Sequence, residues 1–205
     1  MKKNSIYLIG SLCLCTAPFR NYAQLTDQQI NQLKSGKVQP DTSFIYTLPF
    51  AKGKKHFLVQ AYNSKMSHTG ELSLDFKMKQ GSKISASRAG VVEMMREDSD
   101  RGGLDASYMN DGNFIIIRHA DGSKAMYWHL KKDGVLVNQG DTVLTGQHIG
   151  LSGNTGYSAF PHLHFQLQSA SGNDIPSRFY TRRKVRYLRP GKWYKKNKNG
   201  LFLTT

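Results

Sequence analysis

Short runs of β-branched and aromatic residues, separated by turns that contain glycine, make up most of the chain from residue 44 onward. The runs cover residues 56–62, 83–94, 113–119, 125–130 and 162–168. None of them keeps the 3.6-residue period of an amphipathic helix, and their length and flanking glycines are typical of strands. The turns at 120–123 and 133–134 suit antiparallel connections. This pattern predicts an all-β domain built on an antiparallel sheet, with residues 44–170 as its extent.

The first 43 residues have a different pattern. Two lysines precede an apolar run at residues 6–15, which is too short to span a bilayer comfortably and is typical of a signal peptide. We expect cleavage after Ala23, which removes residues 1–23 with both cysteines and exports the rest to the periplasm, the cell envelope or the medium. In the next segment, residues 24–43, Thr26 and Gln29 form a capping box that predicts a short helix to about Lys34, followed by a linker.

Composition and charge indicate one globular domain with a basic end. The chain has 205 residues, and 29 Lys and Arg against 14 Asp and Glu give a net charge of +15. Ten of the basic residues lie between Arg178 and Lys198, in a C-terminal extension that we place at residues 171–205. This extension could hold the protein on anionic polymers of the cell envelope, or it could add a hairpin with a strand at residues 201–203. We predict that the protein is not an integral membrane protein. We also predict that it has no nucleic-acid partner, because the chain has no groove-reading or base-stacking motif.

Histidines and one aspartate supply the candidate chemistry. His162 and His164 are two positions apart in a strand pattern, so both imidazoles should point to one face of a sheet. Asp75 stands between two apolar residues, where a carboxylate needs a partner, and it follows His68 by seven positions. His129 lies in another apolar strand run. Each residue taken alone could be an ordinary hydrogen-bonded structural residue. Two histidines with one carboxylate are nevertheless a common ligand set for a catalytic zinc, and further imidazoles suit proton transfer.

Residues 96–110 interrupt the strand pattern with charges and glycines. Asp98 and Asp100 could begin a calcium-binding loop, but Gly102 and Met109 stand where further ligands would be needed. We therefore predict a solvated surface loop that borders a groove.

Several motifs, in order between about residues 48 and 168, carry a resemblance to a known family. They are Ser67-His68-Thr69-Gly70, Leu74-Asp75-Phe76, residues 81–90, Tyr127-Trp128-His129-Leu130, residues 146–150, Gly153-Asn154-Thr155-Gly156 and Pro161-His162-Leu163-His164-Phe165. Together they resemble the lysostaphin-type zinc metallopeptidases, which cut peptides of the bacterial cell wall. The resemblance implies a β-sandwich-like catalytic domain with one Zn²⁺ per chain, held by His68, Asp75 and His164. It also implies that His129 and His162 are the catalytic histidines.

The same resemblance bears on the remaining aromatic and imidazole side chains. Members of this family often have a tyrosine near the metal, for which Tyr62 and Tyr127 are candidates, although packing on the sheet is the favoured explanation for both. His56, His119 and His148 match no ligand position and are expected to be structural or exposed.

The resulting hypothesis is an exported, zinc-dependent endopeptidase that hydrolyses a peptide bond of peptidoglycan with a metal-activated water. The bond could be a D-Ala cross-link, a bond of the stem peptide or one in a glycine bridge. The alternative is a non-catalytic cell-wall-binding protein or an activator of other murein hydrolases. The presence of all five key positions favours the enzyme over this alternative.

Overall fold

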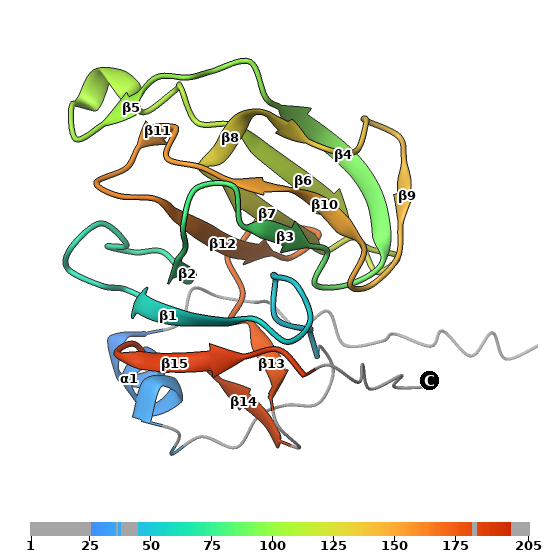
Figure 1. Ribbon diagram of the computed structural model, residues 1–205. Coiled ribbons are helices and arrows are strands. Elements are labelled where there is room, and N and C mark those ends of the chain that lie inside the picture. Colours follow the sequence, from blue (N-terminus) through green and yellow to red (C-terminus); the bar gives the residue numbers. More distant parts are fainter. Residues whose placement is uncertain (1–25, 36, 38–44, 182–183, 198–205) are drawn as a thin grey trace, which may run out of the picture.

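The computed structural model describes residues 26–35, 37, 45–181 and 184–197, and its main element is an eight-stranded antiparallel sheet (Figure 1). In spatial order the strands are β15 (Lys192–Lys195), β1 (Lys55–Gln60), β2 (Ser73–Lys77), β12 (His162–Gln168), β7 (Lys124–Trp128), β6 (Phe114–Arg118), β4 (Gly90–Arg96) and β9 (Thr142–Val143). A smaller sheet consists of β3 (Lys83–Ser85), β10 (His148–Ser152) and β8 (Leu130–Val135). The two sheets share one apolar core. The predicted all-β, sandwich-like fold is therefore confirmed.

Alternation along the central strands separates the core from the opposite face of the large sheet. On β12, the side chains of Leu163, Phe165 and Leu167 are fully buried and belong to the core cluster. The intervening His162 and His164 point to the other face, where they line a cleft. The structure thus confirms the prediction that both imidazoles point to one face, which followed from the two-residue period of a strand.

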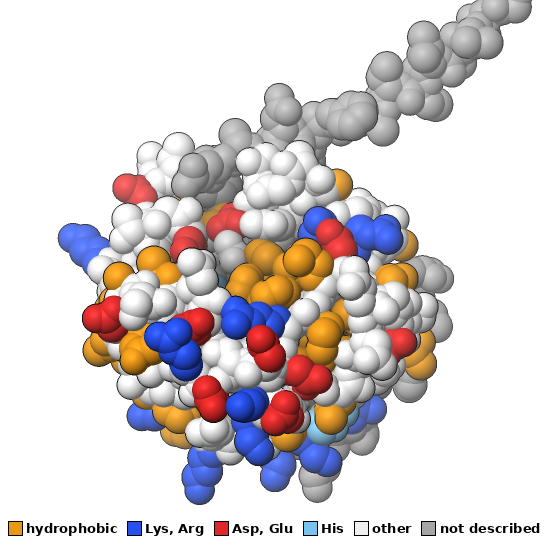
Figure 2. Space-filling view, turned by 90° about the horizontal axis from the view of Figure 1, so that it is seen from above, with side chains coloured by type: hydrophobic (Ala, Val, Ile, Leu, Met, Phe, Trp, Pro, Cys, Tyr) orange, Lys and Arg blue, Asp and Glu red, His pale blue; other side chains and the backbone are white. Residues whose placement is uncertain are grey.

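Residues 96–110 form a loop at one rim of the molecule, as predicted. This loop carries β5 (Gly102–Gly103) and the 3₁₀ turn η1 (Ala106–Tyr108), and β5 pairs with β11 (Gly156–Tyr157) in parallel, an exception to the otherwise antiparallel pairing of the named strands. Asp98 pairs with Arg96 at 2.6 Å and Asp100 with Lys132 at 3.2 Å, so both carboxylates have basic partners. Figure 2 looks down on this end of the molecule and shows acidic, basic and apolar side chains intermixed.

The two ends of the described chain lie together at the β15 edge of the large sheet, at the bottom of Figure 1. Helix α1 (Asp27–Ser35) begins at the predicted capping box, in which the Thr26 backbone N–H donates to Gln29 Oε1 at 2.8 Å and the Gln29 backbone N–H donates to Thr26 Oγ1 at 3.3 Å. After the central domain, β13 (Arg178–Thr181) pairs with β14 (Lys184–Tyr187), and β15 then pairs with β1 at the edge of the large sheet. The basic extension therefore contributes strands to the fold.

Two local predictions were wrong. The turn expected at Asp133 and Gly134 lies inside β8. Leu130 of β8 pairs with Ser152 of β10 and Val135 pairs with Gly150, so β8 advances five residues between two pairs that are only two residues apart on β10. Asp133 has a φ of 52°, and the two residues lie in an irregular bulge of β8 and do not form a turn that reverses the chain. The run at 83–94 is also not one strand, because residues 86–89 separate β3 from β4, which belong to different sheets.

Some predictions concern parts of the chain outside the described residues. These are the signal peptide at 1–23, most of the linker before residue 45, and the strand expected at 201–203. Of the helices within the described ranges, none combines the length and apolarity needed to cross a bilayer.

Candidate metal centre

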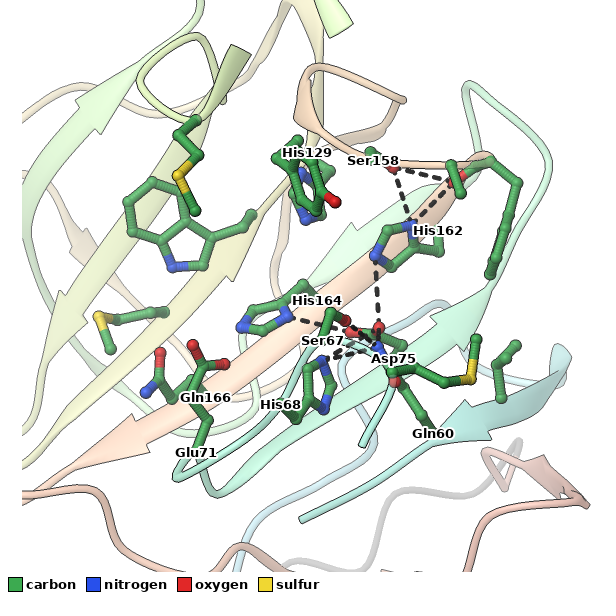
Figure 3. Close-up of a pocket in the computed structure, with 18 of the residues that line it drawn as sticks. Gln60, Ser67, His68, Glu71, Asp75, His129, Ser158, His162, His164 and Gln166 are labelled. Atoms are coloured by element: carbon green, nitrogen blue, oxygen red, sulfur yellow. Dashed lines mark hydrogen bonds and ion pairs between the residues drawn. The ribbon is translucent and has the colours of Figure 1, made fainter. Parts of the chain in front are cut away.

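A cleft of about 480 Å³ lies on the face of the large sheet that is turned away from the core (Figure 3). Side chains from β1, β2, β7 and β12 line it, together with residues of the loop between β1 and β2 and of the loop before β12. Leu104 and Met109 of the 96–110 loop form part of its rim, which confirms that this loop borders a groove. All five residues that the sequence marks as ligands or catalytic histidines line this one cleft.

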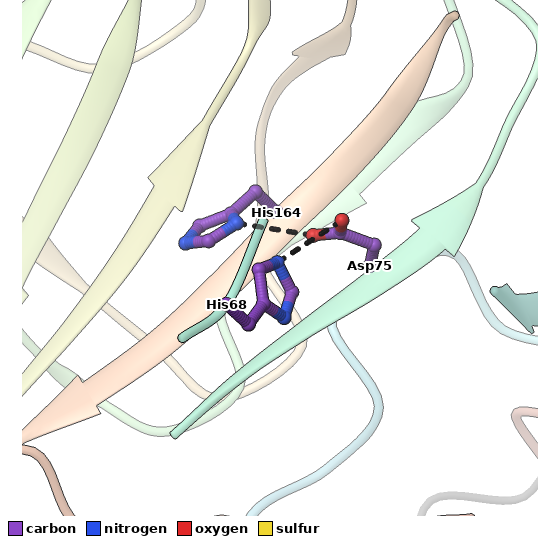
Figure 4. A group of neighbouring side chains, drawn as sticks. All are labelled: His68, Asp75 and His164. Atoms are coloured by element: carbon purple, nitrogen blue, oxygen red, sulfur yellow. Dashed lines mark hydrogen bonds and ion pairs between the residues drawn. The ribbon is translucent and has the colours of Figure 1, made fainter. Parts of the chain in front are cut away.

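His68, Asp75 and His164 come together on the floor of the cleft (Figure 4). Antiparallel pairing of β2 with β12 places His164 directly opposite Asp75, so the two side chains share a face. His164 Nδ1 lies 3.0 Å from Asp75 Oδ1, and His68 Nε2, from the loop between β1 and β2, lies 3.1 Å from Asp75 Oδ2. One ligand atom from each residue can be chosen so that all lie within 4.8 Å of one another.

Hydrogen bonds within this cluster favour the ionised form of Asp75, which is the form that binds a cation. Burial alone would raise the pKa of Asp75, but hydrogen bonds from His164 and His68 outweigh it and hold the pKa well below its usual range. Burial likewise opposes a charge on His164, yet the hydrogen bond to Asp75 raises the pKa of that imidazole. The cluster brings together one carboxylate and two imidazoles, of which Asp75 and His68 are buried and His164 is half-buried, and Nδ1 of His68 has no hydrogen-bond partner in the described part of the chain. This donor set fits zinc, for which two histidines and one carboxylate are a usual three-residue ligand set.

His129 and His162 lie beside each other on another side of the cleft, with ring centroids 4.6 Å apart. His129 Nδ1 donates to the Thr155 carbonyl at 2.7 Å, and His162 Nδ1 donates to the Phe160 carbonyl at 2.8 Å. Because a carbonyl can only accept, both Nδ1 atoms carry the hydrogen. Nε2 of each neutral ring is then the nitrogen that can accept a proton. Nε2 of His162 lies 3.6 Å from Asp75 Oδ2.

Both imidazoles are held in the neutral form. Burial, followed by the neighbouring His162 and His164, lowers the pKa of His129 to about 3. Burial also lowers the pKa of His162, although Asp75 opposes this effect. His129 has in addition a φ of 63°, so a non-glycine residue occupies the left-handed region at the junction of β7 and β8. Strain of this kind is a feature of functional sites that the surrounding structure stabilises.

Neither candidate tyrosine lines the cleft. Tyr62 and Tyr127 are fully buried in the core, and burial raises the pKa of both hydroxyls. The Tyr62 hydroxyl donates to the Ser177 carbonyl at 2.7 Å, and the Tyr127 hydroxyl accepts from the Ser87 N–H at 2.8 Å. Both are structural residues, as the sequence favoured.

The three remaining histidines lie outside the metal centre. Each has one ring nitrogen within hydrogen-bond distance of a backbone carbonyl: His56 of Lys77, His119 of Ala89 and His148 of Gly150. This outcome agrees with the structural role expected for them. One polar residue of the site was missed, because the sequence read Gln60 as an ordinary position in a strand. Its amide nitrogen lies 3.0 Å from His68 Nε2, and it also donates to Asp75 Oδ2.

Comparison with curated proteins finds relatives that resemble part of this chain. Peptidoglycan DD-endopeptidase ShyA of Vibrio cholerae is 40% identical over 93 residues, which cover 45% of this chain and 19% of that protein. Lysostaphin of Staphylococcus simulans is 40% identical over 96 residues, covering 45% of this chain and 17% of lysostaphin. The match therefore spans about a fifth of the length of these curated relatives.

A solved structure and a family profile extend this likeness. The crystal structure of a zinc containing peptidase from Vibrio cholerae matches with a TM-score of 0.50 and 27% identity, over 64% of this chain and 39% of that one. The profile of Peptidase family M23 matches residues 68–176, just over half of the chain, and this range includes the four histidines and the aspartate of the site. With the lysostaphin-type resemblance of its motifs confirmed, the chain belongs to peptidase family M23.

Proposed function

We propose that this protein is a zinc-dependent endopeptidase that hydrolyses peptide bonds in bacterial peptidoglycan. The observation that carries the proposal is the convergence in one cleft of buried His68 and Asp75 and half-buried His164 with two further imidazoles, His129 and His162. The similarity to a peptidoglycan DD-endopeptidase agrees with this substrate class.

In this proposal His68, Asp75 and His164 hold one zinc ion. When bound, zinc supplies Lewis acidity, which polarises a peptide carbonyl and makes water acidic enough to attack it near neutral pH. The ligand residues would hold the positive charge of the ion at the floor of the cleft. The antiparallel pairing of β2 and β12 does so for Asp75 and His164 without requiring any loop to close.

His129 and His162 handle protons on the open side of the cleft. The hydrogen bonds from their Nδ1 atoms to backbone carbonyls fix the ring orientation and leave Nε2 of each ring to exchange a proton. One imidazole can accept the proton of the attacking water, and an imidazolium can return a proton to the leaving amine. Once Nε2 of one ring has taken up a proton, its N–H can also donate to the oxyanion of the tetrahedral intermediate.

The location of the activity belongs to the same proposal. Peptidoglycan lies outside the cytoplasmic membrane, so the proposal includes export through the segment 1–23, with residues 44–170 as the catalytic unit. Attraction of the basic extension to anionic polymers of the envelope stays a prediction of its charge.

The test is hydrolysis of purified peptidoglycan sacculi, followed by mass analysis of the soluble fragments. We expect fragments cut at a peptide bond, no release after chelation, and recovery when zinc is added. His148→Gln serves as the matched control, because it removes an imidazole outside the cleft and should keep full activity. Release that survives both chelation and His164→Ala would contradict the proposal. Binding to sacculi with no release would favour the alternative of a non-catalytic cell-wall binder.

A further inference from the structure

The side chain of Gln60 contacts two of the three proposed ligands. Its amide nitrogen lies 2.5 Å from Asp75 Oδ2 and 3.0 Å from His68 Nε2, and it donates to Ser67 Oγ at 2.6 Å. An ionised carboxylate can only accept, so the nitrogen end of the amide must face Asp75. Gln60 therefore connects strand β1, the loop that carries His68 and strand β2 through one polar group (Figure 3).

A bulge in β1 gives Gln60 this orientation. Leu58 pairs with Phe76, but the next pair is Gln60 with Asp75, so Val59 is an extra residue in β1. Without this shift, Val59 would stand opposite Asp75. Gln60 would then stand opposite Leu74, on the face that forms the apolar core. Bulges beside active sites commonly redirect one side chain in this way.

The other end of the same amide has no structural role in the described part of the chain. Gln60 is only 6% exposed, and its Oε1 is buried there without a hydrogen-bond partner. A buried polar atom without a partner is unfavourable, so an apolar side chain of similar size would serve packing better. What glutamine adds at this position is the donation from its nitrogen to Asp75 and toward the loop of His68.

We propose that Gln60 is a positioning residue for the metal ligands. By donating to Oδ2 of Asp75, it leaves Oδ1, which lies 3.0 Å from Nδ1 of His164, as the oxygen offered to the ion. Through Ser67 it also holds the residue that precedes His68. Hydrogen-bond partners of metal ligands generally tune affinity in this way. The inference rests on the proposed zinc site.

The experiment measures zinc affinity of the full chain by competition with a chromophoric chelator. Gln60→Met keeps a similar shape and removes the donor, and we expect it to weaken zinc binding about 10-fold or more. It should also change the visible spectrum of the cobalt-substituted protein, which reports ligand geometry and not stability. Gln168→Met is the matched control, since Gln168 lines the cleft but contacts none of the three ligands, and it should leave both measurements unchanged.

Unchanged zinc affinity and an unchanged cobalt spectrum in Gln60→Met would overturn the inference. If Gln60→Met fails to fold, Ser67→Ala decides, because Ser67 is exposed and its loss removes only the second anchor of the amide. We expect Ser67→Ala to weaken zinc binding by a smaller factor, and an unchanged affinity would again overturn the inference. Absence of zinc binding by the unaltered chain would instead overturn the proposed function, and the inference with it.

Discussion

Replacement of His129 separates its catalytic role from its backbone role. The residue has a φ of 63°, and its Nδ1 donates to the Thr155 carbonyl at 2.7 Å. His129→Ala and His129→Asn both remove the imidazole. Asparagine is far more common than alanine in the left-handed region, where the cost for an ordinary residue is roughly 1–2 kcal/mol. We therefore expect the two variants to differ in stability and to be equally inactive.

The magnitudes follow from these contacts. Loss of the hydrogen bond to Thr155 costs about 1 kcal/mol in both variants. Alanine has no compensating preference for the left-handed region, so His129→Ala should be destabilised by about 1–2 kcal/mol and His129→Asn by less. Loss of a general acid–base group should lower turnover by about 10²- to 10⁴-fold in both. Because His129 is not in the proposed ligand set, zinc content should be unchanged.

Urea unfolding measures the stabilities, and release of soluble fragments from sacculi measures turnover. Activity of His129→Asn close to that of the unaltered protein would refute the catalytic assignment. Activity that rises with stability from the alanine to the asparagine variant would also refute it, since the imidazole would then matter only for folding.

Further predictions concern buried groups away from the metal. Tyr127→Phe leaves the Ser87 N–H without its acceptor, so urea unfolding should show a loss of about 1–3 kcal/mol while turnover stays unchanged; a large loss of turnover would restore the tyrosine as a catalytic candidate. Burial lowers the pKa of His119, so native His119 stays neutral where the unfolded chain takes up a proton. The protein should therefore lose stability as the pH falls below about 6.5, by at most about 1.4 kcal/mol per pH unit, and His119→Gln should lack this part of the slope. Lys196 is buried, and its Nζ has no partner in the described chain, so its pKa is lowered from 10.5 to about 8. This shift corresponds to a loss of about 3 kcal/mol in the free energy of unfolding while the amine is charged. Lys196→Met should therefore be more stable by about this amount at pH 7, and the difference should disappear as the pH rises from 8 to 10.5. An equal gain at both ends of that range would contradict the charge-based explanation.

The site could be predicted as far as strand periodicity and family motifs reach. The spacing of His162 and His164 places both imidazoles on one face of any strand, whatever that strand pairs with. The meeting of His164 with Asp75 depends on the register of β12 against β2, and only the resemblance to known enzymes implied that pairing.

Gln60 illustrates what the sequence could not indicate. Its orientation depends on an extra residue in β1 relative to β2, and a bulge of this kind is set by the pairing of two strands and not by a local motif. The left-handed backbone of His129 has the same origin, because it is imposed at the junction of two strands in different sheets.

The basic extension shows a second limit of sequence reasoning. Its segments Lys184–Tyr187 and Lys192–Lys195 are both strands, whereas the sequence indicated a strand only at residues 201–203, which lie outside the described residues. Lysine on an edge strand protects that edge from pairing with other chains, and β15 is the edge of the large sheet. A high count of basic residues therefore concealed a strand pattern.

Zinc stoichiometry of purified variants tests the central claim most directly. We predict about one zinc per unaltered chain, loss of the metal in His68→Ala, Asp75→Ala and His164→Ala, and retention in His129→Ala and His162→Ala. Full zinc content in all three ligand variants, measured on folded protein, would contradict the assignment of the metal centre.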